Sequence, residues 1–295
     1  MIFAVLDVLP GNVAQVILGE SATPEALKAL ESRLGLDRPA LERYGTWMAG
    51  LARGDMGQSV AYDTPVQQLV QERLVVTVPL TVMAMVLTTL LALALGVYAA
   101  AHHNRLGDVG VMVLSQLGIA VPSFWFAIVL ILLFAVKAQW FSAGGFPGWD
   151  DGWWSGFKAL VLPALALAAV QASILTRITR SAVLDVLRED FVRTARAKGL
   201  GRREVLWRHV LRNAFVPVLT VIGLQFASLL AGTVVVEYVF SLPGLGRLVF
   251  QAIANRDLVV VRNCVMLLAA MVVGVNAVVD LLAAWIDPRL RTPRG

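Results

Sequence analysis

The sequence has few charged residues and a single cysteine. Charged side chains make up 15% of the 295 residues, whereas 58% are hydrophobic. A soluble globular domain is typically about a quarter charged and about half apolar, so the composition excludes an ordinary soluble domain. Cys264, the one cysteine, lies in an apolar run and excludes both an intrachain disulfide and a cysteine-based zinc site. The mean hydropathy of +0.74 predicts an integral membrane protein.

The sequence also lacks the motifs of common catalytic and metal centres. No G-x-x-x-x-G-K-[ST] phosphate-binding loop occurs, and Gly199-Leu200-Gly201 is a glycine fragment with no strand before it. No Ser-His-Asp arrangement stands out, and the adjacent His102 and His103 have no Cys, Asp or Glu placed to complete a metal site. We therefore predict a chain that is not an enzyme, has no catalytic or metal residues and needs no cofactor.

Long apolar segments recur along the chain, and a helix needs about 20 such residues to span a membrane. Before them lies a polar region over residues 12–73, in which we expect short helices opening near Pro24, Pro39 and Pro65. Pro122 should kink the second span, because a proline inside a span frees a backbone carbonyl. The prediction is an all-α transmembrane bundle with five complete spans, over residues 75–101, 109–136, 157–178, 214–239 and 262–285.

A strongly basic stretch runs from Arg188 to Arg212, between two of these spans. Its apolar residues recur at amphipathic spacing that is broken once, at Gly199 and Gly201, which predicts two short helices joined by a glycine turn. Basic loops between spans belong on the cytoplasmic side. Charge alone leaves three interpretations open: a solvated loop, an amphipathic helix resting on anionic lipid, or a docking surface for a soluble partner.

The amino-acid sequence of this stretch resembles that of a known family. FVRTARAKGL over 191–200, followed by LWRHVLRNA over 206–214, is similar to the cytoplasmic loop of binding-protein-dependent ABC transporter permeases, in particular the dipeptide/oligopeptide/nickel branch. AVPSFW over 120–125, EYVFSLPGLG over 237–246 and IDPRLR over 286–291 also resemble segments of that family. The resemblance implies that the loop contacts an ATPase subunit through Arg193, Thr194, Ala195, Arg196, Ala197, Lys198, Gly199 and Leu200.

The loop departs from the family pattern in two places. The family's Glu-Ala-Ala triplet is Arg193-Thr194-Ala195 here, so its acid is missing, as is usual in the peptide branch. Of the family's later Ile-x-Leu-Pro, only Leu211 agrees. Gly199 falls on the family's near-invariant glycine.

The resemblance also implies a type I ABC importer permease fold and a domain organisation. We interpret residues 1–11 as the remnant of a truncated first span, because Val8 to Asn12 are similar to the end of the family's first span. Residues 12–73 are then an extracytoplasmic helical segment, residues 74–286 the permease domain with its coupling loop at 181–213, and residues 287–295 a cytoplasmic tail.

The function implied is that of a permease subunit in the bacterial cytoplasmic membrane, forming half of the translocation pathway of an ATP-driven importer. Its expected partners are a second homologous permease, two cytoplasmic ATPase subunits that hydrolyse the ATP, an extracytoplasmic substrate-binding protein and membrane lipid, but no nucleic acid. Di- and oligopeptides are the expected cargo, with nickel, glutathione or opines as alternatives in the same branch. An ion-coupled secondary transporter and a non-transporting scaffold or receptor are the rival classes.

Two ionisable residues fall inside spans, where charge is costly and usually functional. We expect Asp280 to pair with Arg177 or Arg180, as an alternative to contacting substrate, and Glu237 either to line the outer gate or to reach the interface. The candidate gate and pathway residues are Pro122, Ser123, Glu237, Pro243, Gly244, Gly246 and Asp280.

Overall fold

The computed structural model describes residues 23–33 and 37–286. Within these ranges the chain is built from helices, and its one β-type contact is an isolated bridge between Gln58 and Pro65. The all-α prediction is therefore confirmed. The first-span remnant at 1–11, the helix end at Gly35 and the tail at 287–295 lie outside the described residues.

The chain divides into two compact units. The described part of unit 1 reaches Thr77 and resumes over Pro243–Ala270. It contains α3 (Pro24–Arg33), α4 (Ala40–Ala52), the first turns of α5, α12 (Leu245–Ala254) and the first half of α13. Its core joins Val66 and Val70 of α5 to Leu248 of α12 and Cys264 of α13.

A buried carboxylate holds the loop of unit 1 in place. Asp257 is 1% exposed and accepts hydrogen bonds from the Ser59 hydroxyl at 2.6 Å and from the backbone N–H groups of Val60 and Ala61 at 2.9 and 3.1 Å. Its other oxygen accepts from the Val260 N–H in the first turn of α13. Because a buried carboxylate must be matched by donors, these bonds fix the segment before α5 against the start of α13.

Helix α5 (Val66–Ala101) is longer than the sequence suggested. We expected the short helix that opens near Pro65 to be separate from the span that begins at residue 75, and this expectation is wrong because both belong to α5. The residues at the expected break, Gln71 to Val75, include no glycine, proline or capping residue, so nothing there stops helix propagation. Pro79 is accommodated inside the helix.

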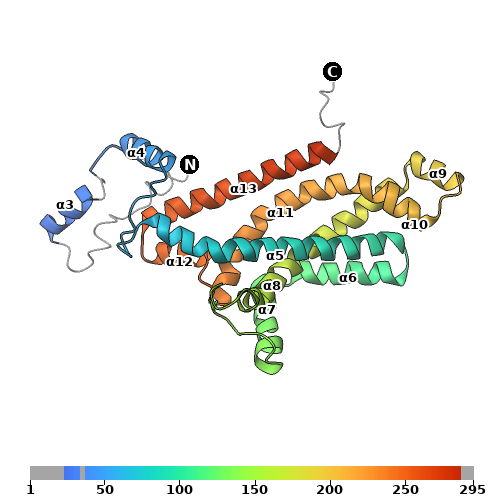
Figure 1. Cartoon of the computed structure of the whole chain (residues 1–295), viewed down its shortest axis with the longest axis horizontal. Coiled ribbons are helices and arrows are strands. Elements are labelled where there is room, and N and C mark those ends of the chain that lie inside the picture. The colour runs from blue at the N-terminus through green and yellow to red at the C-terminus, as the bar shows by residue number, and fades with distance from the viewer. Residues whose placement is uncertain (1–22, 34–36, 287–295) are drawn as a thin grey trace, which may run out of the picture. The chain divides into compact units, whose positions relative to one another are not determined.

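Unit 2 comprises residues Val78–Leu242 and the described chain from Met271 on. Within it, α6 packs on α8, and α8 packs on α11 (Figure 1). Its helices are the rest of α5, α6 (Leu106–Ala120), α7 (Ser123–Leu130), the π-helix η2 (Ile131–Lys137), α8 (Trp153–Leu187), α9 (Asp190–Ala197), α10 (Arg202–Glu204), the π-helix η3 (Val205–Val210), α11 (Leu211–Val239) and the second half of α13 (Leu258–Ile286).

In the part of the chain that the structure describes, four continuous helical stretches are long and apolar enough to cross a membrane: α5, α8, α10 through α11, and α13. The pair formed by α6 and α7–η2 is a fifth candidate, bent by 102°. The break falls at Pro122, as predicted. Val121 is extended, with ψ at 123°, because the proline ring disfavours a helical conformation in the preceding residue.

The membrane topology of this bundle gives a first prediction. Trp153, at the start of α8, is 80% exposed. Arg202, in the basic segment that connects the end of α8 to α11, is also exposed. In a Cys264→Ser background, an impermeant thiol reagent added to intact cells should label Trp153→Cys and leave Arg202→Cys unlabelled until the membrane is opened. Labelling of Arg202→Cys from outside would contradict the orientation.

Candidate coupling site

Helix α9 is amphipathic, and its apolar side is already used. Val192 is fully buried and Ala195 is 7% exposed. Spaced three residues apart, they lie on one face of the helix and join a core with Leu175 and Val183 of α8 and Val218 of α11. Of the rest of the predicted coupling set, Leu200 is half-buried against the same core, whereas the exposed members are Arg193, Thr194, Arg196, Ala197, Lys198 and Gly199.

Gly199 ends this helix in a left-handed conformation. Its φ is +84°, and the N–H groups of Gly199 and Leu200 donate to the carbonyls of Arg196 and Ala195. A Cβ at Gly199 would meet no atom within 4 Å, so the glycine is required by backbone conformation and not by space inside this chain. Gly201 has φ at −65° and precedes α10, so the predicted glycine turn is confirmed. The second helix is not short as predicted, because α10 continues through η3 and α11 to Val239.

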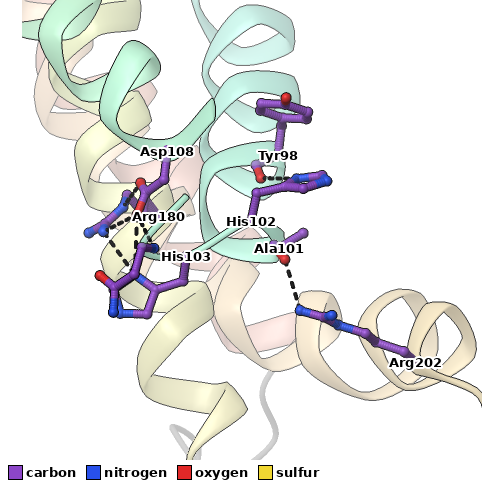
Figure 2. Close-up of polar contacts among 8 residues, drawn as sticks. Tyr98, Ala101, His102, His103, Asp108, Arg180 and Arg202 are labelled. Atoms are coloured by element: carbon purple, nitrogen blue, oxygen red, sulfur yellow. Dashed lines mark hydrogen bonds and ion pairs between the residues drawn. The ribbon is translucent and has the colours of Figure 1, made fainter. Parts of the chain in front are cut away.

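The second helix of the segment is tied to the end of α5. The Arg202 guanidinium donates to the backbone carbonyl of Ala101, the last residue of α5, at 2.9 Å (Figure 2). That carbonyl belongs to a helix C-terminus, where carbonyl groups lack partners within the helix and favour a cation. Val205 and Val210 of η3 are fully buried in the same core as Val192. The segment from α9 to η3 is thus attached to the bundle at several points.

An ion pair fixes the turn between α5 and α6. The side chain of Asp108 is 4% exposed, and its carboxylate accepts hydrogen bonds from both Nε and Nη2 of Arg180 on α8, the latter at 2.7 Å (Figure 2). The Asn104 N–H also donates to it at 3.0 Å, and His103 Nδ1 lies 3.2 Å from the same carboxylate oxygen. A two-point contact of this kind sets both distance and orientation, so it fixes the start of α6 against α8.

The ion pair of Asp108 was not predicted from the sequence, and the predicted pairing of Asp280 with Arg177 or Arg180 is wrong. Arg180 bonds to Asp108, and Arg177 donates to the Gln116 side chain at 3.3 Å, whereas Asp280 is exposed. The reason is that α6 packs directly on α8 and brings its acid to Arg180. The available signal was an acid in the first turn of an apolar helix, five residues after His103.

The candidate gate residues are divided between the two units. In unit 2, Pro122 is the N-cap of α7 and Ser123 its first residue, while Glu237 is completely buried, so the expected reach of its side chain to the interface is wrong. In unit 1, Pro243, Gly244 and Gly246 lie at the start of α12.

Comparison with solved structures identifies the class of this fold. One chain of the inward-facing MetNI methionine ABC transporter aligns over 97% of its length with 75% of this chain, at a TM-score of 0.62 and 15% sequence identity. At that identity the likeness concerns the fold alone, and the fold is that of this ABC transporter chain.

The family follows from the sequence comparison. The family model described as binding-protein-dependent transport system inner membrane component matches residues 92–292, and the model of its N-terminal part matches residues 1–81. The chain therefore belongs to this family.

Two relatives cover nearly the whole chain. A putative peptide transport system permease protein of Brucella abortus (strain 2308) is 42% identical over 98% of this chain and 92% of its own length. The dipeptide transport system permease protein DppB of Alkalihalophilus pseudofirmus is 38% identical over 98% and 93%. The chain is thus a multi-pass permease of the inner membrane that works with ATPase and binding-protein partners, and ATP is hydrolysed by the ATPase subunits.

The Asp108–Arg180 pair gives a second prediction. Asp108→Asn keeps the size of the side chain but leaves a largely buried guanidinium without its counter-charge, which should lower the free energy of unfolding by roughly 3 kcal/mol. Steric trapping in nanodiscs measures this quantity. Adding Arg180→Gln should restore part of the loss, because the uncompensated charge is then gone.

The matched control is the exposed pair formed by Glu204 and Arg208, whose N and O atoms are 3.5 Å apart. Glu204→Gln should cost less than about 1 kcal/mol, as exposed pairs do. Equal losses from Asp108→Asn and Glu204→Gln would show that the pair does not fix α6 to α8.

Proposed function

We propose that this chain forms half of the translocation pathway of a peptide importer, with a second homologous permease forming the other half. The peptide cargo is supported by the relatives, which are named as peptide and dipeptide transport permeases at 42% and 38% identity over nearly the full length. A binding protein on the outer side delivers the peptide, and one ATPase subunit docks on each permease.

The ATPase docks on the exposed side of α9 and the turn at Gly199, within the coupling loop 181–213. The observation that carries this proposal is the burial of Val192 and Ala195 in the bundle. An amphipathic helix resting on lipid needs a free apolar face to insert, and of the large apolar side chains of α9 only Phe191 is exposed, at 42%. The rest of what α9 presents outward is mostly polar and basic, which suits a soluble protein.

Movement of the docked subunit would reach the spans through short, direct contacts. Arg202 connects the segment to the end of α5, and the Asp108–Arg180 pair connects α8 to the start of α6. When the ATPases close, the segment and the ends of these helices move together, and alternating access follows from the relative displacement of the two permeases.

The positions of the buried carboxylates argue against the rival class of ion-coupled transporters. Such a carrier needs acids near the middle of the membrane that bind and release the coupling ion. In the described spans, the buried acids are Asp108, which lies in the first turn of α6 and is bound to Arg180, and Glu237, two residues before the end of α11.

Gly199 gives the third prediction. A β-branched side chain is strained at positive φ, by about 1–3 kcal/mol, and this strain should displace the turn that the ATPase contacts. Gly199→Val should therefore reach the membrane at near-normal abundance but abolish peptide uptake and reduce co-purification of the ATPase. Uptake, co-purification and abundance are measured side by side.

Gly201→Val is the matched control, because Gly201 has a negative φ and open space around its Cβ position. It should retain uptake. Gly199→Asn should be intermediate, since asparagine tolerates the left-handed conformation. Normal uptake by Gly199→Val would contradict the coupling role, and a fall in abundance alone would leave Gly199 a structural turn.

The cargo gives the fourth prediction. Unlabelled di- and oligopeptides should compete with a radiolabelled dipeptide for uptake by cells that carry the complete transporter. Nickel, an opine and glutathione at the same concentration should compete at least about tenfold less well. Competition by one of those three instead of by peptides would reassign the cargo while leaving the importer class intact.

A further inference from the structure

An apolar groove of about 490 Å³ lies in unit 2 beside the coupling loop. Its walls come from the last turns of α5 and α8, from η3 and from the first turns of α11. Ala94, Val183, Trp207, Phe215 and Val218 are among the residues that line it. Its volume falls within the range of about 300–1,000 Å³ that is common for small-molecule sites. A helix, with a diameter of about 10–12 Å, is too wide to enter a groove of this volume.

We propose that this groove binds one acyl chain of an anionic phospholipid from the cytoplasmic leaflet. The walls belong to helix ends that adjoin the cytoplasmic loop, so the groove lies at the level of that leaflet. The lining side chains are aliphatic or aromatic except for Thr179. An apolar groove at the level of a leaflet is filled at little cost by a hydrocarbon chain.

Thr179 is the polar residue in the lining. Its side chain is 1% exposed, and among the described residues its hydroxyl has no hydrogen-bond partner. A buried hydroxyl without a partner is unfavourable, and rotation of this side chain toward the groove would let an ester carbonyl, which is an acceptor, satisfy it. Thr179 precedes Arg180, which contacts the turn between α5 and α6, so the hydroxyl lies near the membrane surface, where lipid esters are found.

The surroundings of the groove favour a negative headgroup. Trp207 lines the groove with 63% of its surface exposed, and tryptophan prefers the membrane–water interface. Arg203, Arg208 and Arg212 are exposed on the same stretch of helix, against one acid, Glu204. Basic clusters next to a span attract anionic lipid. The occupied groove would therefore stabilise η3, which carries the second half of the coupling loop.

The test is native mass spectrometry of the full chain purified with its partner subunits, with phosphatidylglycerol or phosphatidylcholine added. The wild type should retain phosphatidylglycerol in preference to phosphatidylcholine. Ala94 is exposed and lines the groove, so Ala94→Phe should fill the groove without disturbing the core and lower retention about tenfold. Leu90→Phe, on an exposed position of α5 outside the groove, should leave retention unchanged.

A double variant, Arg203→Gln with Arg208→Gln, should reduce the preference for phosphatidylglycerol and keep chain binding. Trp207→Ala removes one wall and should also lower retention, which provides a second test if Ala94→Phe folds poorly. Equal retention by Ala94→Phe and the wild type would overturn the proposal. Capture of a protein segment instead of lipid by a photo-crosslinker at Ala94 would also overturn the proposal.

Peptide uptake measured on the same variants separates this proposal from the importer function. Loss of lipid retention with uptake preserved would leave the importer assignment unaffected.

Discussion

The packing of Val192 and Ala195 against α8 and α11 is the contact on which the coupling site depends. Without it, α9 would be a short polar helix, and helices of this length are not stable by themselves in water. With it, the exposed side chains of α9 are held at a fixed place relative to the spans. In the proposed function, the same contact favours a protein over lipid as the partner of this helix, because it leaves Phe191 as the one large apolar side chain of α9 that is exposed.

Polar contacts then fix the connections that apolar packing leaves free. Apolar side chains bury area without specifying register, whereas a two-point contact between a guanidinium and a carboxylate sets both distance and orientation. Asp108 does this in unit 2, for the start of α6 against α8. Asp257 has a similar role in unit 1, where its carboxylate accepts hydrogen bonds from a hydroxyl and backbone N–H groups and holds the segment before α5 against α13. Each acid lies in or next to the first turn of the helix that it positions.

Much of this architecture could be read from the sequence, and the failures have physical reasons. Apolar length predicted the spans, Pro122 predicted the bend, and the glycines at 199 and 201 predicted the turn, although the helix after the turn continues to Val239. The continuity of α5 through Arg73 was missed because a change from polar to apolar residues is not a signal for a helix end. The pairing of Arg180 could not be predicted, because two acids were available and only the packing of α6 on α8 chooses between them.

The π-helical turn η3 has a consequence for how the chain tolerates insertions and deletions. A π-turn accommodates one residue more than an α-turn does, at the cost of poorer hydrogen bonds. Each residue of an α-helix turns the chain by about 100° around its axis. Removing one residue between Val205 and Val210 would let η3 relax into an ordinary α-helix continuous with α11. The glycine turn and α9 would then be presented on a different side of the bundle, although every side chain of the docking surface remained intact.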